Sequence, residues 1–545
     1  MKNKLNSSGE TMISIQDLSK GFEKENLFGD VNLVIHGKEK IAFVGKNGSG
    51  KTTLFNCLAG KEDFNGRILI SDIKISLMEQ ERNFSNLNKT FEEYLKDKEK
   101  DLEERKQQLE KEIGNPNVYG DEDKFNSLMD EFNLLLTDPS FSVEQKRTKE
   151  ILNKLGIDED ILNQKITTLS GGQKTKLRLA ECLSKKADLY LLDEPTNNLD
   201  LETREWLEKY IDSHISSLIV ISHDRYFLNK MVEKVWDLEN KGVKEWPHGF
   251  GDYVQEKKKY LSGLETKYRY AMKEKKRLLD SATEKRRWAS VAGDRRFKIM
   301  AERLERDAKE YDEVDNPFDF IKTVSIAFNS KDLHNCVIFR LEEIKKKFEK
   351  VLFKDVNQEI MFGEKVCIMG ANGTGKSTLL KMLVGELEMT SGKITTRKEI
   401  KVGYFDQELE SMDKEQTIME FSVKVTGKDE ADLISILARY DFKKESFGKK
   451  IKHLSGGEKG RLNIMRIAFE KNDVLVLDEP TNNLDIYLIE SLENALKNFK
   501  GTIIFVSHDR TFVDKVATKI FEIKDQKLSS FEGNYSDFIK FKEQK

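Results

Sequence analysis

The chain has 545 residues, of which 38% are hydrophobic and 35% charged, and its net charge is −3. This length is too great for one hydrophobic core, so we expect two or three domains, and the composition excludes a wholly disordered chain. No apolar run approaches the roughly 18 residues of a membrane helix, and the N-terminal MKNKLNSSGE has no apolar signal-peptide core, so we expect a cytoplasmic protein. Cys57, Cys182, Cys336 and Cys367 are far apart in sequence, which argues against zinc and iron–sulfur clusters.

One set of motifs occurs twice, in nearly the same order. The pairs are GKNGSGKT (45–52) and GANGTGKS (370–377), LSGGQ (169–173) and LSGGE (454–458), DEPTNNLD ending at Asp200 and at Asp485, and ISHDR (221–225) and VSHDR (506–510). The first pair is offset by 325 residues and the other three by 285. We therefore expect two homologous domains, at about 12–254 and 321–545, joined by a linker at 255–320.

The first copy holds additional residues at about 84–140, where the difference of 40 between the two offsets arises. This stretch has a charged helical pattern, then GNPNVYG, then a second helical pattern, so it predicts an inserted helical arm. The arm is acidic, because residues 88–140 carry 8 Lys/Arg and 15 Asp/Glu. We expect it to avoid RNA and to suit a basic protein.

The linker is basic. Residues 256–309 carry 18 Lys/Arg and 9 Asp/Glu, a net of +9, which leaves −12 for the rest of the chain. Apolar residues at helical spacing predict two antiparallel helices joined near 288–294, the longer of about 30 residues or 45 Å. The basic, Trp-bearing stretch EKRRWASVAGDRRFK (284–298) would then lie at the tip of this hairpin.

Phosphate neutralisation dominates affinity for RNA, so such a tip predicts RNA contact. The candidate contacts are Arg286, Arg287, Trp288, Arg295 and Arg296. A basic run is also compatible with a solvated helix face, and Trp288 could instead close the apolar seam of the hairpin.

GxxxxGK[ST] is the P-loop pattern, in which glycines and a helix N-terminus direct backbone N–H groups toward nucleotide phosphates. Strand-like KIAFVG and KVCIMG precede the two copies, and helix-like segments follow them. The predicted ATP-binding residues are Gly45, Asn47, Gly48, Gly50, Lys51, Thr52 and Thr53 in the first copy and Gly370, Asn372, Gly373, Gly375, Lys376, Ser377 and Thr378 in the second. Thr52 and Ser377 would also hold Mg²⁺.

Two carboxylates end each of the buried-strand patterns LYLLDE and VLVLDE. We expect Asp193 and Asp478 to bind Mg²⁺ through water. Glu194 and Glu479 would act as general bases toward the attacking water. The sequence thus predicts an α/β protein with two P-loop nucleotide-binding domains that hydrolyse ATP to ADP and phosphate.

The combination of LSGG, DEPTNNLD and SHD resembles ATP-binding-cassette (ABC) nucleotide-binding domains over both halves of the chain. The resemblance implies that two ATP molecules are sandwiched between the cassettes. Ser455 and Gly457 would then complete the site built on Lys51, and Ser170 and Gly172 the site built on Lys376. It also implies metal- and water-sensing roles for Gln80 and Gln407, γ-phosphate contacts for His223 and His508, and adenine stacking on Phe22 and Phe348, although both phenylalanines could be core residues.

The layout as a whole resembles the ABC-F family: two cassettes, a helical arm in the first, and a long charged helical linker. Asn198 and Asn483 depart from a histidine that the family often has, and Glu458 departs from the glutamine of LSGGQ. The resemblance implies a monomer at the ribosomal exit site, whose linker reaches the peptidyl-site tRNA and the peptidyl-transferase centre. Ribosome protection against antibiotics is the favoured reading. A housekeeping translation factor, a fused transporter ATPase and a DNA-associated ATPase are the alternatives.

Overall fold

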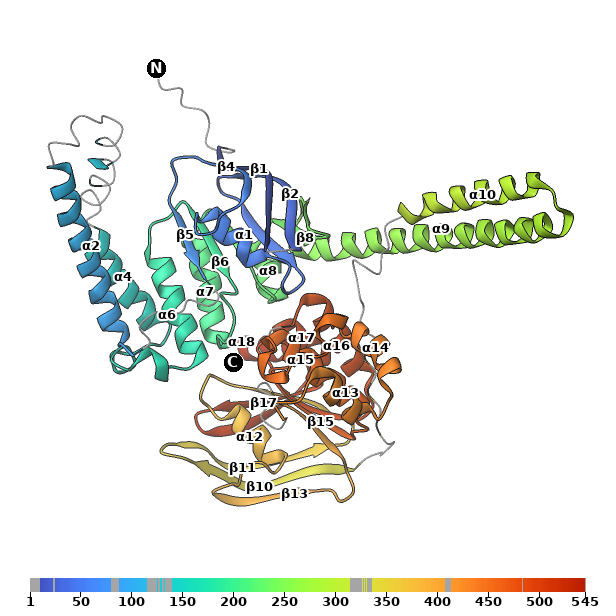
Figure 1. The fold of residues 1–545 in the computed structure, drawn as a ribbon. Helices are drawn as coiled ribbons and strands as arrows, with labels where there is room; N and C mark the ends of the chain where they lie inside the picture. Colours follow the sequence, from blue (N-terminus) through green and yellow to red (C-terminus); the bar gives the residue numbers. More distant parts are fainter. Residues whose placement is uncertain are drawn as a thin grey trace. The chain divides into compact units, whose positions relative to one another are not determined.

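The computed structural model describes residues 10–22, 25–79, 88–114, 125, 128–129, 132, 140–313, 326, 328, 330, 336–406, 413–482 and 484–544. The chain separates into two compact units, one built mainly from residues up to Val243 and the other mainly from Lys244 onward (Figure 1). Within the described part of the chain, no helix combines the length and apolarity of a membrane span.

The first copy of the repeat contains two sheets. A three-stranded antiparallel sheet has the order β2-β1-β4, from β1 (Thr11–Phe22), β2 (Glu25–His36) and β4 (Asn65–Ile70). A six-stranded sheet has the order β5-β6-β7-β3-β8-β9, from β3 (Lys40–Gly45), β5 (Ile75–Met78), β6 (Leu189–Asp193), β7 (Leu218–Ile221), β8 (Lys234–Glu239) and β9 (Gly242–Trp246). Strands β5, β6, β7, β3 and β8 pair in parallel, so their carboxyl ends share one edge, where α/β proteins bind ligands.

The strands that lead to the predicted motifs are buried on both faces, as expected for a parallel sheet covered by other layers. All five residues of β6 are buried, and so are the four central residues of β3. The helices of this copy are α1 (Lys51–Leu58), α2 (Phe91–Ile113), α4 (Ser140–Lys154), α5 (Glu159–Leu162), η1 (Ile166–Thr168), α6 (Gly171–Ser184), α7 (Leu201–His214) and α8 (Arg225–Met231).

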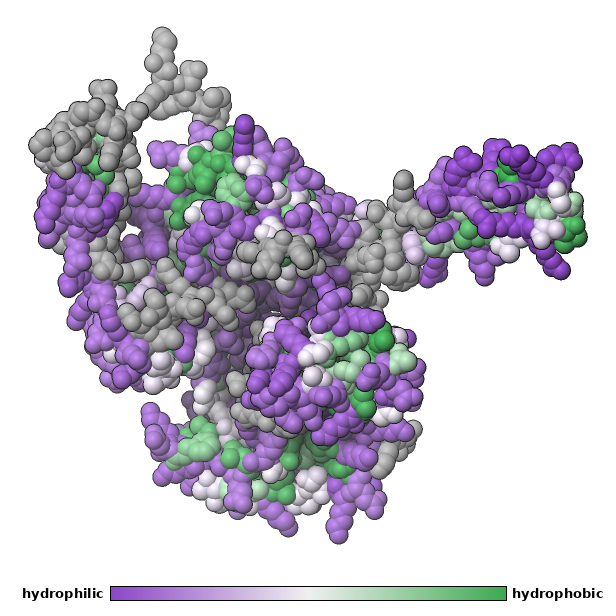
Figure 2. All heavy atoms as spheres, in the orientation of Figure 1, coloured by the Kyte–Doolittle hydropathy of each residue, from purple (hydrophilic) through white to green (hydrophobic). Residues whose placement is uncertain are grey.

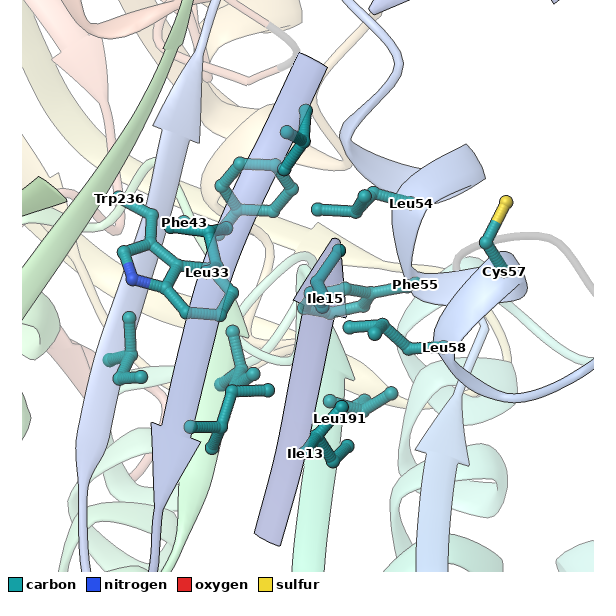
Figure 3. Packing of buried hydrophobic residues seen from close by; sticks show 14 of the residues in the cluster. Ile13, Ile15, Leu33, Phe43, Leu54, Phe55, Cys57, Leu58, Leu191 and Trp236 are labelled. Atoms are coloured by element: carbon teal, nitrogen blue, oxygen red, sulfur yellow. The ribbon is translucent and has the colours of Figure 1, made fainter. Parts of the chain in front are cut away.

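The core of this copy holds the two sheets and the first helix together. Phe43 on β3 meets Phe55 on α1 and, edge to face, Trp236 on β8, each at 6.1 Å between ring centroids. Ile13 and Ile15 of β1 point into the same cluster from the antiparallel sheet (Figure 3). This packing fixes the strand and the helix on either side of the loop at 45–50.

The predicted helical arm is confirmed in its first helix. Helix α2 begins with a capping box in which the Thr90 hydroxyl accepts from the Glu93 N–H and the Glu93 carboxylate accepts from the Thr90 N–H. The second predicted arm helix, at about 121–136, lies almost wholly outside the described residues.

The second copy repeats the first. Its antiparallel sheet has the order β11-β10-β13, from β10 (Val337–Lys347), β11 (Val351–Met361) and β13 (Ser391–Thr396). Its six-stranded sheet has the order β14-β15-β16-β12-β17-β18, from β12 (Lys365–Met369), β14 (Val402–Phe405), β15 (Val474–Asp478), β16 (Thr502–Val506), β17 (Lys519–Lys524) and β18 (Lys527–Glu532). Its helices are α12 (Lys376–Leu383), α13 (Ile418–Thr426), α14 (Glu430–Arg439), η3 (Lys444–Ser446), η4 (Ile451–His453), α15 (Gly456–Phe469), α16 (Ile486–Asn498), α17 (Arg510–Val516) and α18 (Tyr535–Glu543).

The linker forms the predicted hairpin of two antiparallel helices, α9 (Phe250–Ala292) and α10 (Arg295–Lys309), and ends in η2 (Glu310–Glu313) (Figure 1). At 43 residues, or roughly 65 Å, α9 is longer than the expected 30, because no residue between Phe250 and Ala292 breaks it. Gly293, at φ 64°, ends α9, and the Asp294 carboxylate caps α10 by accepting from the Arg296 N–H at 2.9 Å.

Small residues form the seam of the hairpin. Ala271 and Ala282 of α9 and Ala301 and Ala308 of α10 are all buried, which lets the two helices approach closely. Met300 is also one of the apolar residues at helical spacing in α10, but it is 54% exposed and lies outside this seam. Figure 2 shows a hydrophilic hairpin with hydrophobic surface gathered at its end.

Candidate active sites

The first P-loop runs from the end of β3 to the start of α1. Lys51, the first residue of α1, is only 8% exposed, and its ammonium donates to the carbonyls of Gly45 and Lys46 at 2.8 Å each. The loop therefore curls around the lysine, and the helix N-terminus faces the space that it encloses. A helix N-terminus with a buried ammonium beside it attracts an anion such as a phosphate.

The second P-loop repeats this conformation between β12 and α12. Gly375 has φ 99° where Gly50 has φ 104°, and both precede a buried lysine. A Cβ on Gly375 would lie 2.9 Å from the ring of Phe353, so a side chain has neither the backbone freedom nor the space that it needs. The remaining predicted loop residues surround these positions: Asn47, Gly48, Asn372 and Gly373 are exposed, and Thr53 and Thr378 are half-buried.

In each copy a P-loop hydroxyl meets a carboxylate at the carboxyl end of a buried strand, β6 in the first copy and β15 in the second. The Thr52 hydroxyl donates to Asp193 at 2.6 Å, and the Ser377 hydroxyl donates to Asp478 at 3.1 Å. Burial raises the pKa of Asp193 to about 6, although the Thr52 hydrogen bond and Lys51 oppose the shift, and burial likewise raises the pKa of Asp478. Hydroxyl and carboxylate oxygens beside a phosphate loop are the ligands that Mg²⁺ uses in nucleotide sites, so this pair fits the predicted metal.

The glutamate that follows each aspartate is held next to the predicted histidine. Glu194 and Glu479 have φ near 50°, and each carboxylate accepts from the backbone N–H of the histidine, at 3.3 Å from His223 and 3.2 Å from His508. The Nε2 atoms of these histidines lie 3.3 and 3.4 Å from the other carboxylate oxygen. Each glutamate is 29 positions from its histidine in the chain, and the fold brings the two together at one edge of the sheet.

Burial governs the charges in this pair. It raises the pKa of Glu194 to about 8, and Asp193 adds to the shift. Burial and Lys51 lower the pKa of His223 to about 3. Burial therefore favours the neutral form of both side chains in this contact. Positive charge brought by a bound metal would favour the carboxylate form of Glu194.

Both LSGG segments open a helix. Ser170 caps α6 and Ser455 caps α15, each through a capping box with the residue three positions on. The Ser170 N–H donates to Gln173 at 2.8 Å, and the Ser455 N–H donates to Glu458 at 2.7 Å. The glutamate of LSGGE thus performs the same local capping as the glutamine of LSGGQ.

Close packing explains a glycine and an asparagine near the first LSGG segment. A Cβ on Gly172 would lie 2.7 Å from the Asn198 carbonyl oxygen. Asn198 itself has φ 59°, a left-handed conformation that asparagine tolerates better than most residues. Its presence in place of histidine therefore suits the local backbone.

Three predicted site residues, and also Asn483 of the second DEPTNNLD segment, lie in parts that the structure does not describe fully. Gln80, Gln407 and Asn483 lie outside the described residues, as does the side chain of Phe22. Phe348 is 56% exposed, with the Lys346 ammonium 4.6 Å from its ring centroid, so it is not a core residue. An exposed aromatic ring is available for stacking.

The aspartate of each SHD motif has a structural role that the motif alone did not predict. Asp224 caps α8 by accepting from the Phe227 N–H at 3.0 Å, and Asp509 caps α17 in the same way. These caps begin the helices directly after His223 and His508 and so fix the backbone that carries both histidines. The position of an aspartate before an apolar helical pattern was the signal that could have revealed this role.

The comparisons with known proteins agree with this geometry. The family described as "ABC transporter" matches residues 28–197 and 353–482, which together are more than half of the chain. The chain is 31% identical to ABC transporter F family member 5 of Arabidopsis thaliana, over 97% of this chain and 77% of that protein. This protein belongs to the ABC-F family.

As an ABC-F protein it is an ATPase, and its two cassettes bind ATP. It is also 32% identical to the probable ATP-binding protein YbiT of Escherichia coli O157:H7, over 97% of this chain and 99% of that protein. Among solved structures, the archaeal ribosome recycling factor aABCE1 has a TM-score of 0.58 at 19% identity and covers 97% of this chain, with 92% of its own chain matched. At that identity the likeness shows the fold alone.

Proposed function

We propose that this ABC-F ATPase binds the ribosomal exit site and uses the α9–α10 hairpin to act on the peptidyl-transferase centre and the peptidyl-site tRNA. The observation that carries the proposal is the hairpin itself, with a net charge of +9 over residues 256–309 in a chain whose remainder is −12. RNA attracts such an element electrostatically, whereas the acidic remainder is repelled from phosphate. A cytoplasmic location follows from this function.

The residues at the end of the hairpin support the proposal. Arg286, Arg287, Arg295 and Arg296 are exposed there. Two of them also make short-range pairs, Arg286 with Glu305 at 2.7 Å and Arg296 with Asp294 at 2.9 Å, and these pairs orient the guanidinium groups without burying them. Arginine presents several N–H donors in a plane, which suits phosphate oxygens and base edges.

The surroundings of Trp288 support both of the roles considered from the sequence. Its ring packs edge to face on Phe297 at 5.8 Å, and the Lys285 ammonium lies 5.2 Å from its centroid. It therefore closes the end of the hairpin. Half of the residue, 51%, remains exposed and is available to stack on a base.

Two structural neighbours act on the ribosome, which supports a ribosomal role for this protein. One is the archaeal ribosome recycling factor aABCE1, and another is ABCE1 bound to the ribosome together with archaeal Pelota. By analogy we assign the acidic arm to a basic ribosomal protein near the exit site. We favour ribosome protection against antibiotics over a housekeeping role, because the hairpin is long and ends in a bulky aromatic residue.

The ATP chemistry that would drive this action follows from the two sites. Lys51 and Lys376 would bind the β- and γ-phosphates, and Glu194 and Glu479 would accept the proton of the attacking water. His223 and His508 would contact the γ-phosphate. Mg²⁺, when bound at Thr52 with Asp193 and at Ser377 with Asp478, would supply positive charge that offsets the charge of the phosphates.

Ribosome binding is tested by co-sedimentation of the E194Q/E479Q double variant with ribosomes in ATP. Loss of both bases should preserve ATP binding and trap the complex, so the variant should pellet with ribosomes in ATP and not in ADP. Absence from the ribosome pellet would overturn the proposal. Co-purification with a membrane protein would support the transporter alternative, and stimulation of ATP hydrolysis by DNA more than by ribosomes would support the DNA-associated one.

Expression in a susceptible host then separates the two ribosomal roles. Ribosome protection predicts a rise in the inhibitory concentration of antibiotics that bind near the peptidyl-transferase centre. Unchanged inhibitory concentrations, together with a trapped ribosome complex, would assign the protein to the housekeeping role.

A further inference from the structure

The two LSGG segments differ by a pair of charges. In the second copy, Glu458 of LSGGE forms an ion pair with Lys449, whose ammonium lies 3.0 and 3.2 Å from the two carboxylate oxygens. In the first copy the corresponding residues, 285 positions earlier, are Gln173 and Gln164. Both members of the pair thus change together, from two neutral amides to one cation and one anion.

The local fold confirms that these positions correspond. Lys449 precedes Lys450, which makes an isolated β-bridge with Thr417, and Gln164 precedes Lys165, which makes the same bridge with Thr90. In both copies a 3-10 helix follows, η4 and η1, and then the capped helix with its LSGG start. Gln164 and Lys449 therefore occupy equivalent places beside equivalent helix N-termini.

The Glu458 carboxylate is held at the start of α15 by the capping box. It accepts from the Ser455 N–H at 2.7 Å, and its own N–H donates to the Ser455 hydroxyl at 3.3 Å. Burial by itself would raise the pKa of this carboxyl, but the hydrogen bonds from Ser455 and Lys449 hold it below its usual value. A full negative charge is thus fixed at a helix N-terminus that should receive a phosphate.

Such a charge opposes anion binding unless a cation offsets it. The attraction of a helix N-terminus for anions comes from partial positive charge on its first N–H groups, and a neighbouring carboxylate competes with a phosphate for that charge. The first copy has a neutral amide here and needs no cation. The second copy has the carboxylate and also has Lys449.

The pair contributes little to folding by itself. The side chains of Lys449 and Glu458 are 38% and 19% exposed, and ion pairs this close to water stabilise proteins only weakly. The stability of the second copy therefore does not explain why both residues differ from those of the first copy.

We propose that Lys449 is a positioning residue for ATP binding, which neutralises Glu458 so that the N-terminus of α15 can accept the terminal phosphate of ATP. The proposal rests on the proposed ATP chemistry and on the contact with that phosphate that the family resemblance implies for Ser455 and Gly457. It also implies that the two LSGG helix starts carry the same net charge. LSGGQ has a neutral glutamine there, whereas in LSGGE the negative charge of the glutamate is offset by Lys449.

The test is steady-state ATP hydrolysis by the full-length protein without ribosomes, for K449Q, E458Q and K449Q/E458Q, at low and high salt. K449Q leaves the carboxylate without its cation and should raise KM for ATP by roughly two- to fivefold, the effect of one charge at a helix terminus. Added salt should shrink this difference. The double variant reproduces the first-copy pair and should return KM to within twofold of the parent.

A matched swap in the first copy provides a second readout. Q173E alone should raise KM, and Q164K/Q173E should restore it. K449R, which keeps the charge, should behave as the parent, and thermal unfolding of each variant checks its fold. The proposal is overturned if K449Q matches the parent, or if K449Q/E458Q is as impaired as K449Q, which would indicate a structural role. Because ribosomes are absent, either result is independent of ribosome binding.

Discussion

The ammonium of Lys257 on α9 donates a hydrogen bond to the phenol oxygen of Tyr487 on α16. Both residues belong to the same compact unit, and Lys257 is only 3% exposed. The ammonium also lies 5.0 Å from the Tyr487 ring and 5.6 Å from the ring of Tyr253. One residue further on, Lys258 pairs with Glu490 at 3.3 Å. Helix α9, the longer helix of the basic hairpin, is therefore attached by these contacts to α16, the helix that follows DEPTNNLD in the second copy.

Removal of the phenol oxygen should weaken this attachment. Y487F leaves a buried ammonium without one of its acceptors, and we expect a loss of about 1–2 kcal/mol in the free energy of unfolding of this unit. K257M/Y487F removes both polar partners and should lie closer to the parent than Y487F does. Thermal unfolding of the parent, both single variants and the double variant measures the coupling. Additive effects of the two substitutions would mean that the hydrogen bond contributes nothing.

The hydroxyls at Thr52 and Ser377 should be required for metal-dependent hydrolysis. T52V/S377A removes the proposed metal ligand from both sites and should lower the rate of ATP hydrolysis by about tenfold or more at limiting Mg²⁺. T52S/S377T exchanges the two hydroxyl residues and serves as the control, with a rate near that of the parent. Equal rates of ATP hydrolysis for the two variants would show that these hydroxyls do not bind the metal.

The arginines at the hairpin end should matter for translation and not for basal hydrolysis. Replacing Arg286, Arg287, Arg295 and Arg296 by Ala should preserve ATP hydrolysis without ribosomes and weaken the effect on an in vitro translation reaction, because phosphate contacts are lost. The matched control replaces Lys267, Lys273, Lys276 and Arg277, in the middle of α9, by Ala. The control changes the net charge equally, so equal effects of the two variants on translation would show that only the total charge of the hairpin matters. Loss of basal hydrolysis in the arginine variant would show a structural role for the hairpin end.

Two glycines of the second P-loop should differ in their tolerance of a side chain. Both have positive φ, but a Cβ on Gly375 would meet Phe353 at 2.9 Å, whereas a Cβ on Gly373 meets nothing within 4 Å. G375A should therefore cost about 1–2 kcal/mol more in the free energy of unfolding than G373A. Differential scanning calorimetry of the two variants checks this order. An equal loss of stability would mean that the positive φ, and not the contact with Phe353, causes the destabilisation.

Three of the four cysteines should react slowly with thiol reagents in the native protein. Burial raises the pKa of Cys182 to about 11 and also raises the pKa values of Cys57 and Cys367, so at pH 8 the reactive thiolate form is scarce. Cys336 is partly exposed. Titration with a chromogenic disulfide should give one fast thiol in the native state and four after denaturation, and C336S should abolish the fast phase. Two or more fast thiols would contradict the burial of Cys57, Cys182 and Cys367.

Sequence patterns predicted much of the fold because they repeat locally. The apolar runs before Gly45 and Gly370 and the acids that end LYLLDE and VLVLDE have spacings that physical chemistry ties to parallel strands and a phosphate loop. The alternation of charged and apolar residues likewise predicted the hairpin. Its length was underestimated, because the start of a basic region does not mark the start of a helix such as α9.

Local pattern cannot show which distant residues meet. The contact of Glu194 with His223 and that of Asp193 with Thr52 depend on the order of strands in the sheet, which brings their carboxyl ends to one edge. The pKa values at these sites depend on burial, and burial is a property of the packed chain.

The amino-acid sequence alone is enough to predict a tandem pair of P-loop domains with an acidic arm and a basic helical linker. These features follow from motif spacing, charge and periodicity along the chain. Three contacts become visible only in the folded chain: Trp288 packs on Phe297, Lys449 pairs with Glu458, and Lys257 joins α9 to α16. Those relationships bring together residues that are separated in sequence, by 9 positions in the first two pairs and 230 in the last, and only a folded backbone sets such distances.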